Sequence, residues 1–145
     1  MTIGLIDTGF LLAVFDQRDE HHVEALAFVD LLAQDDCIIL PIVLVEATYI
    51  LQRYARQDVR PQFLSSVNKR RFPLDNIDYS DLERSTELLV RYPRLDFVDT
   101  CLIAYAERNN IQAICTYDLR DFSMVKPRHV DSFILLPSQF DRLWG

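Results

Sequence analysis

The chain is poor in glycine and lacks the short motifs that carry several common hydrolytic mechanisms. It has three glycines in 145 residues, and it contains no Walker-type glycine loop, no GxSxG nucleophile elbow and no HExxH zinc motif. These absences argue against a P-loop nucleotide hydrolase, a serine hydrolase of the elbow type and a zincin protease.

Long apolar runs are absent as well. No run approaches the roughly 20 residues that a membrane-spanning helix needs, and the N-terminus lacks the basic, apolar and small-residue sections of a signal peptide. We therefore expect a cytoplasmic protein that does not associate with a membrane. Since half of its residues are apolar, a chain of this length fits one domain around one core.

Cysteine is scarce and shows no metal-binding spacing. Cys37, Cys101 and Cys115 each lie in an apolar stretch, without a CxxC pair and without a nearby histidine. Cysteines in this setting are usually small buried hydrophobic groups, and a reactive thiol is the alternative.

Basic residues are outnumbered, which at first argues against a nucleic-acid partner. The net charge is −7, whereas proteins that bind nucleic acids usually have a basic surface. Divalent ions bound by the acids would offset part of this charge locally. The basic residues also cluster, either as solvated faces or as parts of a basic rim, at Lys69, Arg70 and Arg71, at Arg91 and Arg94, and at Arg120, Lys126 and Arg128.

The informative feature is a set of carboxylates at the edges of apolar runs. An ionised carboxylate is costly in apolar surroundings, and several in one cleft repel each other unless a cation lies between them. This pattern indicates a divalent metal site. The acids are Asp7 after IGLI, Glu46 in PIVLVEATYIL, Asp96 and Asp99 in LDFVDTCLIAYA, and Asp118 and Asp121 in TYDLRDF.

Apolar runs and helical spacing alternate along the chain, which predicts a three-layer α/β/α sandwich with a mainly parallel central sheet. The expected strands are 2–6, 37–40, 112–116 and 133–136, with a brief extended piece near 74–77. The expected helices are one beginning after residue 8, and 19–33, 41–57, 58–69, 80–92 and 97–109.

Several polar residues predict where these helices begin. Asp58 is expected to cap the helix over 58–69, and Ser80 with Glu83 has the spacing of a capping box. Asp96 is expected as the N-cap of the helix over 97–109, with Asp99 in the first turn, where the helix dipole favours negative charge.

Four of the acids are expected to meet at one edge of the sheet. Asp7 and Asp118 follow strands, and ligands of parallel sheets gather at the carboxyl ends of strands. Asp99 at a helix start and Glu46 on a packed helix can lean over that edge. Mg²⁺ or Mn²⁺ prefers such oxygen ligands, and the chemistry that fits is phosphodiester hydrolysis by an activated water, without a protein nucleophile.

The segments IGLIDTGFLLAVFD, VEATYIL and LDFVDTCLIAYAERNNIQAICTYDLRDF resemble the PIN-domain ribonucleases. In size and motif order the chain is most similar to the VapC-type toxins of toxin–antitoxin pairs, and the likeness covers nearly all of it. The resemblance implies a single PIN-like nuclease domain over 1–145 that cuts RNA with Mg²⁺ or Mn²⁺. It also implies a homodimer held inactive by a small antitoxin.

The resemblance also implies roles for individual residues. Asp7 and Asp99 bind the metal directly, and Glu46 and Asp118 complete the catalytic cluster. Two hydroxyl residues match positions where the family has small side chains of this kind, namely Thr8 and Thr116.

Other residues near these motifs are expected to have structural rather than catalytic roles, with Asp96 open to both. Asp96 is either only a helix cap or a cap that also approaches the metal. Asp121 is expected to organise the loop after the strand, through Arg120, rather than to bind metal. His21 and His22 are expected to be structural.

Three alternative functions fit the same residues. One is an orphan or housekeeping PIN nuclease without an antitoxin, and another is a catalytically weak RNA-binding PIN module. The third is a phosphatase similar to haloacid dehalogenases with Asp7 as nucleophile, although that class favours DxD where this chain has Asp7, Thr8 and Gly9.

Overall fold

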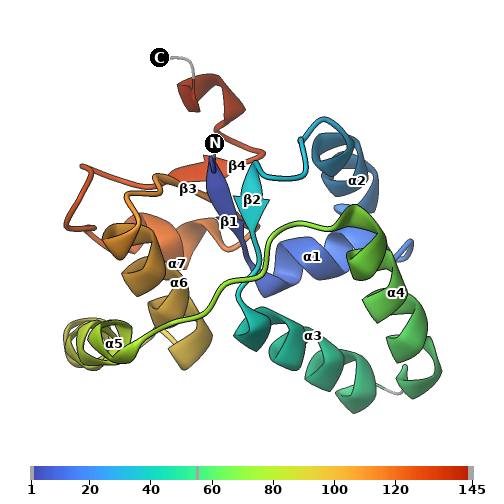
Figure 1. The fold of residues 1–145 in the computed structure, drawn as a ribbon, viewed down its shortest axis with the longest axis horizontal. Helices are drawn as coiled ribbons and strands as arrows, with labels where there is room; N and C mark the ends of the chain where they lie inside the picture. Colours follow the sequence, from blue (N-terminus) through green and yellow to red (C-terminus); the bar gives the residue numbers. More distant parts are fainter. Residues whose placement is uncertain (1, 55, 144–145) are drawn as a thin grey trace.

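A small parallel sheet lies between helices in the computed structural model, which describes residues 2–54 and 56–143 (Figure 1). The strand order is β2-β1-β3-β4, and every neighbouring pair is parallel, which confirms the expected central sheet. The strands are β1 (Gly4–Ile6), β2 (Cys37–Ile38), β3 (Ala113–Cys115) and β4 (Ile134–Leu136). The extended piece expected near 74–77 is reduced to one bridge between Ile39 and Leu74.

Helices cover both faces of this sheet, so the three-layer architecture is confirmed. Figure 1 shows α1, α2 and α4 on one side, α5, α6 and α7 on the other, and α3 crossing below the strands. The helices are α1 (Thr8–Phe15), α2 (His22–Asp30), α3 (Pro41–Arg53), α4 (Arg60–Arg70), α5 (Tyr79–Arg91), α6 (Phe97–Arg108) and α7 (Leu119–Met124), with short 3₁₀ turns η1 (Gln57–Val59) and η2 (Phe140–Leu143). No helix in the described ranges is long and apolar enough to span a bilayer.

Strands β1 and β3 approach closely at the centre of the sheet. Gly4 pairs with Ala113, and a Cβ atom added at Gly4 would lie 2.9 Å from the Ala113 carbonyl oxygen. Real Cβ atoms do not approach an oxygen so closely, so only glycine fits this position without a backbone shift.

The three cysteines are free and buried, as expected. Cys37 and Cys115 lie on strands two apart in the sheet, with their Sγ atoms 3.9 Å from each other. Burial raises the pKa of Cys101 to about 11. The contact with Cys37, together with burial, raises the pKa of Cys115 well above its usual value. These thiols therefore stay protonated and act as packing groups.

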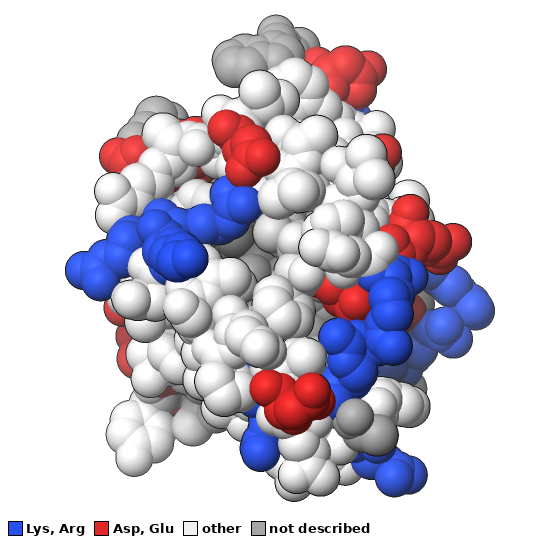
Figure 2. All heavy atoms as spheres, turned by 90° about the vertical axis from the view of Figure 1, so that its right-hand side faces the viewer, with Lys and Arg blue, Asp and Glu red and all other residues white. Residues whose placement is uncertain are grey.

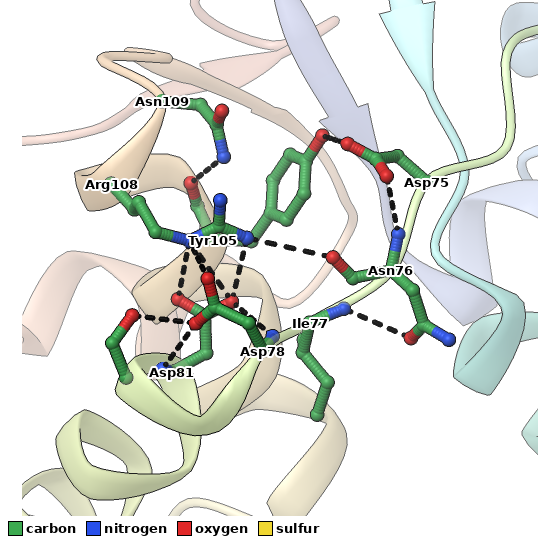
Figure 3. A network of polar contacts seen from close by, with 9 residues as sticks. Asp75, Asn76, Ile77, Asp78, Asp81, Tyr105, Arg108 and Asn109 are labelled. Atoms are coloured by element: carbon green, nitrogen blue, oxygen red, sulfur yellow. Dashed lines mark hydrogen bonds and ion pairs between the residues drawn. The ribbon is translucent and has the colours of Figure 1, made fainter.

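Helices α5 and α6 are joined by a polar network at their ends (Figure 3). The Arg108 guanidinium donates to both carboxylate oxygens of Asp81, at 3.0 Å from Nε to Oδ1 and 2.8 Å from Nη2 to Oδ2. Asp81 is 2% exposed, and Arg108 also faces Asp78, 3.4 Å away. The Tyr105 hydroxyl donates to Asp75 at 2.6 Å, so the segment before α5 is held to α6.

Two of the expected helix caps are wrong. The capping box of α5 is formed by Asp78 and Asp81, and Ser80 only donates a hydrogen bond to Asp78. An acid pair two positions earlier supplies both cap bonds, so Ser80 and Glu83 lie inside the helix. Asp58 lies within η1, and α4 begins after Val59 without a side-chain cap.

Helix α7 was not expected from the sequence. It is six residues long and begins directly after Asp118, whose carboxylate accepts from the backbone N–H of Asp121 at 3.1 Å. Six residues are too few to show a helical apolar period, so local patterns do not predict this helix.

Candidate active site

Asp7 is fixed at the carboxyl end of β1. Its backbone N–H donates to the Cys115 carbonyl at 3.0 Å, which continues the pairing of β1 with β3. Its carboxylate accepts from the Thr8 backbone N–H at 2.8 Å and from the Thr116 hydroxyl at 2.7 Å. Asp7 is 8% exposed, and these two hydrogen bonds orient its carboxylate.

Burial makes the charge of Asp7 unfavourable. Removal from water raises its pKa from 3.8 to about 6, although both hydrogen bonds act in the opposite direction. The charges of Glu46 and Asp118 raise it further, which places Asp7 within electrostatic reach of both carboxylates.

Asp99 is held by the capping box at the start of α6. Its backbone N–H donates to Asp96 Oδ1 at 2.8 Å, and Asp96 N–H donates back to Asp99 Oδ2 at 3.2 Å. Asp96 is therefore the N-cap, as expected. Burial raises the pKa of Asp99 to about 8, with further contributions from the charges of Asp96, Asp7 and Asp118.

Asp118 follows β3 and faces the same edge. Its backbone N–H donates to the Thr116 hydroxyl at 2.9 Å, so that hydroxyl links the backbone of Asp118 to the carboxylate of Asp7. Burial and the neighbouring Asp121 carboxylate raise the pKa of Asp118, while the charge of Arg94 lowers it.

Three carboxylates come closest together. Oxygen atoms of Asp99, Asp118 and Asp121 all lie within 4.8 Å of one another. Asp121 pairs with Arg94, with 2.5 Å between Nε and Oδ1. The expectation that Asp121 acts through Arg120 is therefore wrong, because its cationic partner comes from the loop before α6.

Glu46 contributes at longer range. It is half-buried on α3, and its carboxylate forms no hydrogen bond or ion pair with the other described residues. Its effect on Asp7 is that of a nearby like charge. An acid in this position is available to bind a cation directly or through water.

The donor set fits a hard divalent cation. Every acid named here offers oxygen, which Mg²⁺ and Mn²⁺ prefer. The Thr8 hydroxyl, next to Asp7, is buried and has no hydrogen-bond partner in the described structure. An unpaired buried hydroxyl beside several mutually repelling carboxylates fits a site that binds a hard cation.

The histidines make contacts that agree with a structural role. His21 stacks on Tyr117 with ring centroids 3.9 Å apart. The His22 Nδ1 atom lies 2.8 Å from the Ala13 carbonyl, so it ties α2 to α1.

Arg94 is the residue of this region that sequence reasoning missed. In the sequence it forms a basic cluster with Arg91, but its guanidinium contacts Asp121 at the edge of the acidic group. The two residues are 27 positions apart, and no local pattern connects them.

Comparison with known proteins agrees with this geometry. A family model described as "PIN domain" matches residues 4–126. The protein named Ribonuclease VapC26 from Mycobacterium tuberculosis is 26% identical over 135 residues, covering 92% of this chain and 99% of the relative.

Solved structures show the same fold. The crystal structure of VapC20 from Mycobacterium tuberculosis, described as a sarcin-ricin loop cleaving toxin, has a TM-score of 0.74 at 21% identity and covers 87% of this chain and 97% of its own. A DNA-bound VapBC structure from Salmonella typhimurium has a TM-score of 0.65 at 15% identity, with 93% and 97% covered. A toxin–antitoxin complex from Klebsiella pneumoniae has a TM-score of 0.61 at 24% identity, with 84% and 92% covered. Because the family model spans most of the sequence and includes every acid of the sheet edge, this chain belongs to the PIN domain family.

Proposed function

We propose that this protein is an endoribonuclease that hydrolyses RNA phosphodiesters with Mg²⁺ or Mn²⁺, and that it is the toxin of a toxin–antitoxin pair. The observation that carries the proposal is the gathering of buried, mutually repelling carboxylates at one sheet edge in a PIN-domain chain. The similarity to the protein named Ribonuclease VapC26 supports RNA as the substrate.

The proposed ligands are Asp7 and Asp99, with Glu46 and Asp118 completing the catalytic cluster. When bound there, Mg²⁺ or Mn²⁺ supplies activation of a water molecule and neutralises charge at the phosphate. The protein's part is to present oxygen atoms in fixed positions. The raised pKa values of Asp7 and Asp99 reflect charge that such a cation would offset.

Neighbouring groups orient these ligands. The Thr116 hydroxyl restrains Asp7, and the backbone N–H of Asp96 restrains Asp99. The Thr8 backbone N–H also restrains Asp7. We assign these three residues to positioning the ligands rather than to direct reaction with RNA.

RNA phosphates need cationic contacts despite the net negative charge. Figure 2 shows Lys and Arg gathered in separate groups on the face that carries α2 and α4. Arg120, which directly precedes Asp121 in the chain, is also exposed. We propose that such exposed cations bind the phosphate backbone, which positions RNA without reading its bases.

The partners follow from the relatives. Toxin–antitoxin complexes are among the similar structures, and we propose a small antitoxin as this protein's partner, a homodimeric assembly and a cytoplasmic location. Expression of the chain alone is expected to arrest growth, whereas the Asp7→Asn variant is not. Growth arrest by both would contradict a toxic nuclease activity.

The activity is tested with purified protein, an RNA pool and Mg²⁺ or Mn²⁺. Cleavage is expected to stop on addition of a chelator and to fall at least 100-fold in Asp7→Asn and in Asp99→Asn. Asp131→Asn is the matched control because Asp131 is exposed and lies outside the acidic group. Cleavage that persists in chelator, or in both site variants, would refute the mechanism. RNA binding without cleavage would favour an RNA-binding PIN module.

A further inference from the structure

One side chain of the acidic group is already paired with a cation of the protein itself. Arg94 lies in the loop between α5 and α6, and its Nε atom is 2.5 Å from Asp121 Oδ1. The Arg94 side chain is 50% exposed, whereas that of Asp121 is 13% exposed. The guanidinium therefore reaches inward from the surface to the edge of the carboxylates.

Asp121 connects this pair to the rest of the group. Its backbone N–H donates to Asp118 Oδ1, and its carboxylate lies within 4.8 Å of oxygen atoms of Asp99 and Asp118. A charge on Arg94 thus acts on the carboxylates at short range. Because the Asp121 side chain is 13% exposed, this charge is screened less than a charge in open solvent.

We infer that Arg94 is a positioning residue that serves as an internal counterion: it holds the Asp121 carboxylate away from an incoming divalent cation and keeps the acids together while no cation is bound. This inference rests on the proposed cation site. It adds that Arg94, which binds neither RNA nor metal, lowers the affinity of the site for the divalent cation.

If Arg94 acts as a counterion, its removal has two effects that the loss of a purely structural contact would not have. Removing the guanidinium frees a carboxylate and deletes a positive charge near the cation, so cation binding must become tighter. It also leaves the acids unneutralised in the cation-free protein, so that form must become less stable. A residue that only anchored α7 would lower stability with and without cation alike.

The test compares Mn²⁺ binding, by titration calorimetry, in wild type, Arg94→Gln and Arg91→Gln. Arg91 is the matched control because it is an exposed arginine of the neighbouring helix end, bonded to Tyr92 and not to the acids. Arg94→Gln is expected to tighten Mn²⁺ binding about tenfold, with a smaller difference at high salt. Arg91→Gln is expected to remain within about twofold of wild type.

A double variant shows whether the effect passes through Asp121. In the Asp121→Asn background, Arg94→Gln is expected to change the Mn²⁺ dissociation constant by less than about twofold, because the guanidinium has lost the carboxylate that holds it in place. Arg94→Lys keeps the charge and is expected to stay closer to wild type than Arg94→Gln. Arg94→Ala, which also deletes the charge, replaces Arg94→Gln should that variant not fold.

The outcomes separate this inference from the proposed function. If wild type binds Mn²⁺ and the Arg94 variants bind it equally or more weakly, the inference is refuted while the cation site stands. If no variant binds Mn²⁺, both the site and the inference fail. Tighter binding by Arg94→Gln, together with a lower melting temperature only in chelator, supports the inference.

Discussion

At the scale of single residues, burial and hydrogen bonds distinguish the acids proposed to bind the cation from the other acids of the chain. Asp7 and Asp99 are each 8% exposed, and each is held by hydrogen bonds that fix its carboxylate. Hydrogen bonds alone would lower the pKa of a carboxyl group. In both residues the loss of water outweighs them, so each pKa is raised.

These shifts predict how the stability of the cation-free protein depends on pH. The folded pKa values, about 6 for Asp7 and about 8 for Asp99, exceed the ordinary 3.8. Between about pH 4 and 8 the folded state therefore binds more protons than the unfolded state, and stability falls as pH rises through this window. Urea unfolding at several pH values, in the presence of a chelator, measures this change in the free energy of unfolding.

Asp99→Asn is expected to flatten this pH dependence, while Asp131→Asn is expected to keep the wild-type slope. Stability that rises steadily from about pH 5 to 8 in chelator would contradict the raised pKa values.

At the scale of elements, the sheet and the helix pairs set where the acids lie. Strands β1 and β3 run side by side, so the residues that follow them meet at one edge. The α5–α6 pair brings the start of α6, with Asp99, to that same edge. The contacts between these strands and between these helices therefore determine where the acids of the site lie.

The close approach of β1 and β3 predicts a large effect for a small substitution. Gly4→Ala places a methyl group against the Ala113 carbonyl and is expected to destabilise the protein by about 1 to 3 kcal/mol. Gly9→Ala is the matched control, because nothing lies within 4 Å of its added Cβ. In a helix it is expected to be neutral or to stabilise by about 0.5 to 1 kcal/mol. Equal effects of both, by urea unfolding, would disprove the close contact.

The end of α6 depends on the pair between Arg108 and Asp81. Arg108→Met leaves the Asp81 carboxylate, 2% exposed, without its guanidinium partner. A loss of about 2 to 4 kcal/mol is expected in urea unfolding. The double variant with Asp81→Asn is expected to lose less than the sum of the two single variants, since the buried charge is gone. Additive losses would show that the two side chains do not interact.

At the scale of the whole molecule, the acids make folding and cation binding interdependent. A cation that binds only the folded state stabilises it by mass action. Mn²⁺ at about 100 times its dissociation constant is expected to add about 2.7 kcal/mol. The gain is expected to grow from about pH 6 to 8, as Asp7 and Asp99 lose their protons.

Thermal unfolding with and without Mn²⁺ measures this gain. Asp7→Asn is expected to remove most of it, because a proposed ligand is lost. If Mn²⁺ stabilised wild type and Asp7→Asn equally, the cation would have to bind elsewhere on the protein.

Much of the architecture follows from local patterns in the sequence. Short apolar runs gave the four strands near their observed positions, and Asp96 was correctly expected to cap α6. Local patterns misplaced the starts of α4 and α5, because several neighbouring polar residues can serve as caps and packing decides among them.

By itself the sequence determined the alternation of strands and helices and the positions of Asp7 and Asp118 after strands, since these depend on residues a few positions apart. Only the tertiary structure decided that Asp99, Asp118 and Asp121 lie within 4.8 Å of one another and that Arg94 pairs with Asp121. Such contacts join segments far apart along the chain, and their geometry is fixed by how the helices pack on the sheet rather than by any local propensity.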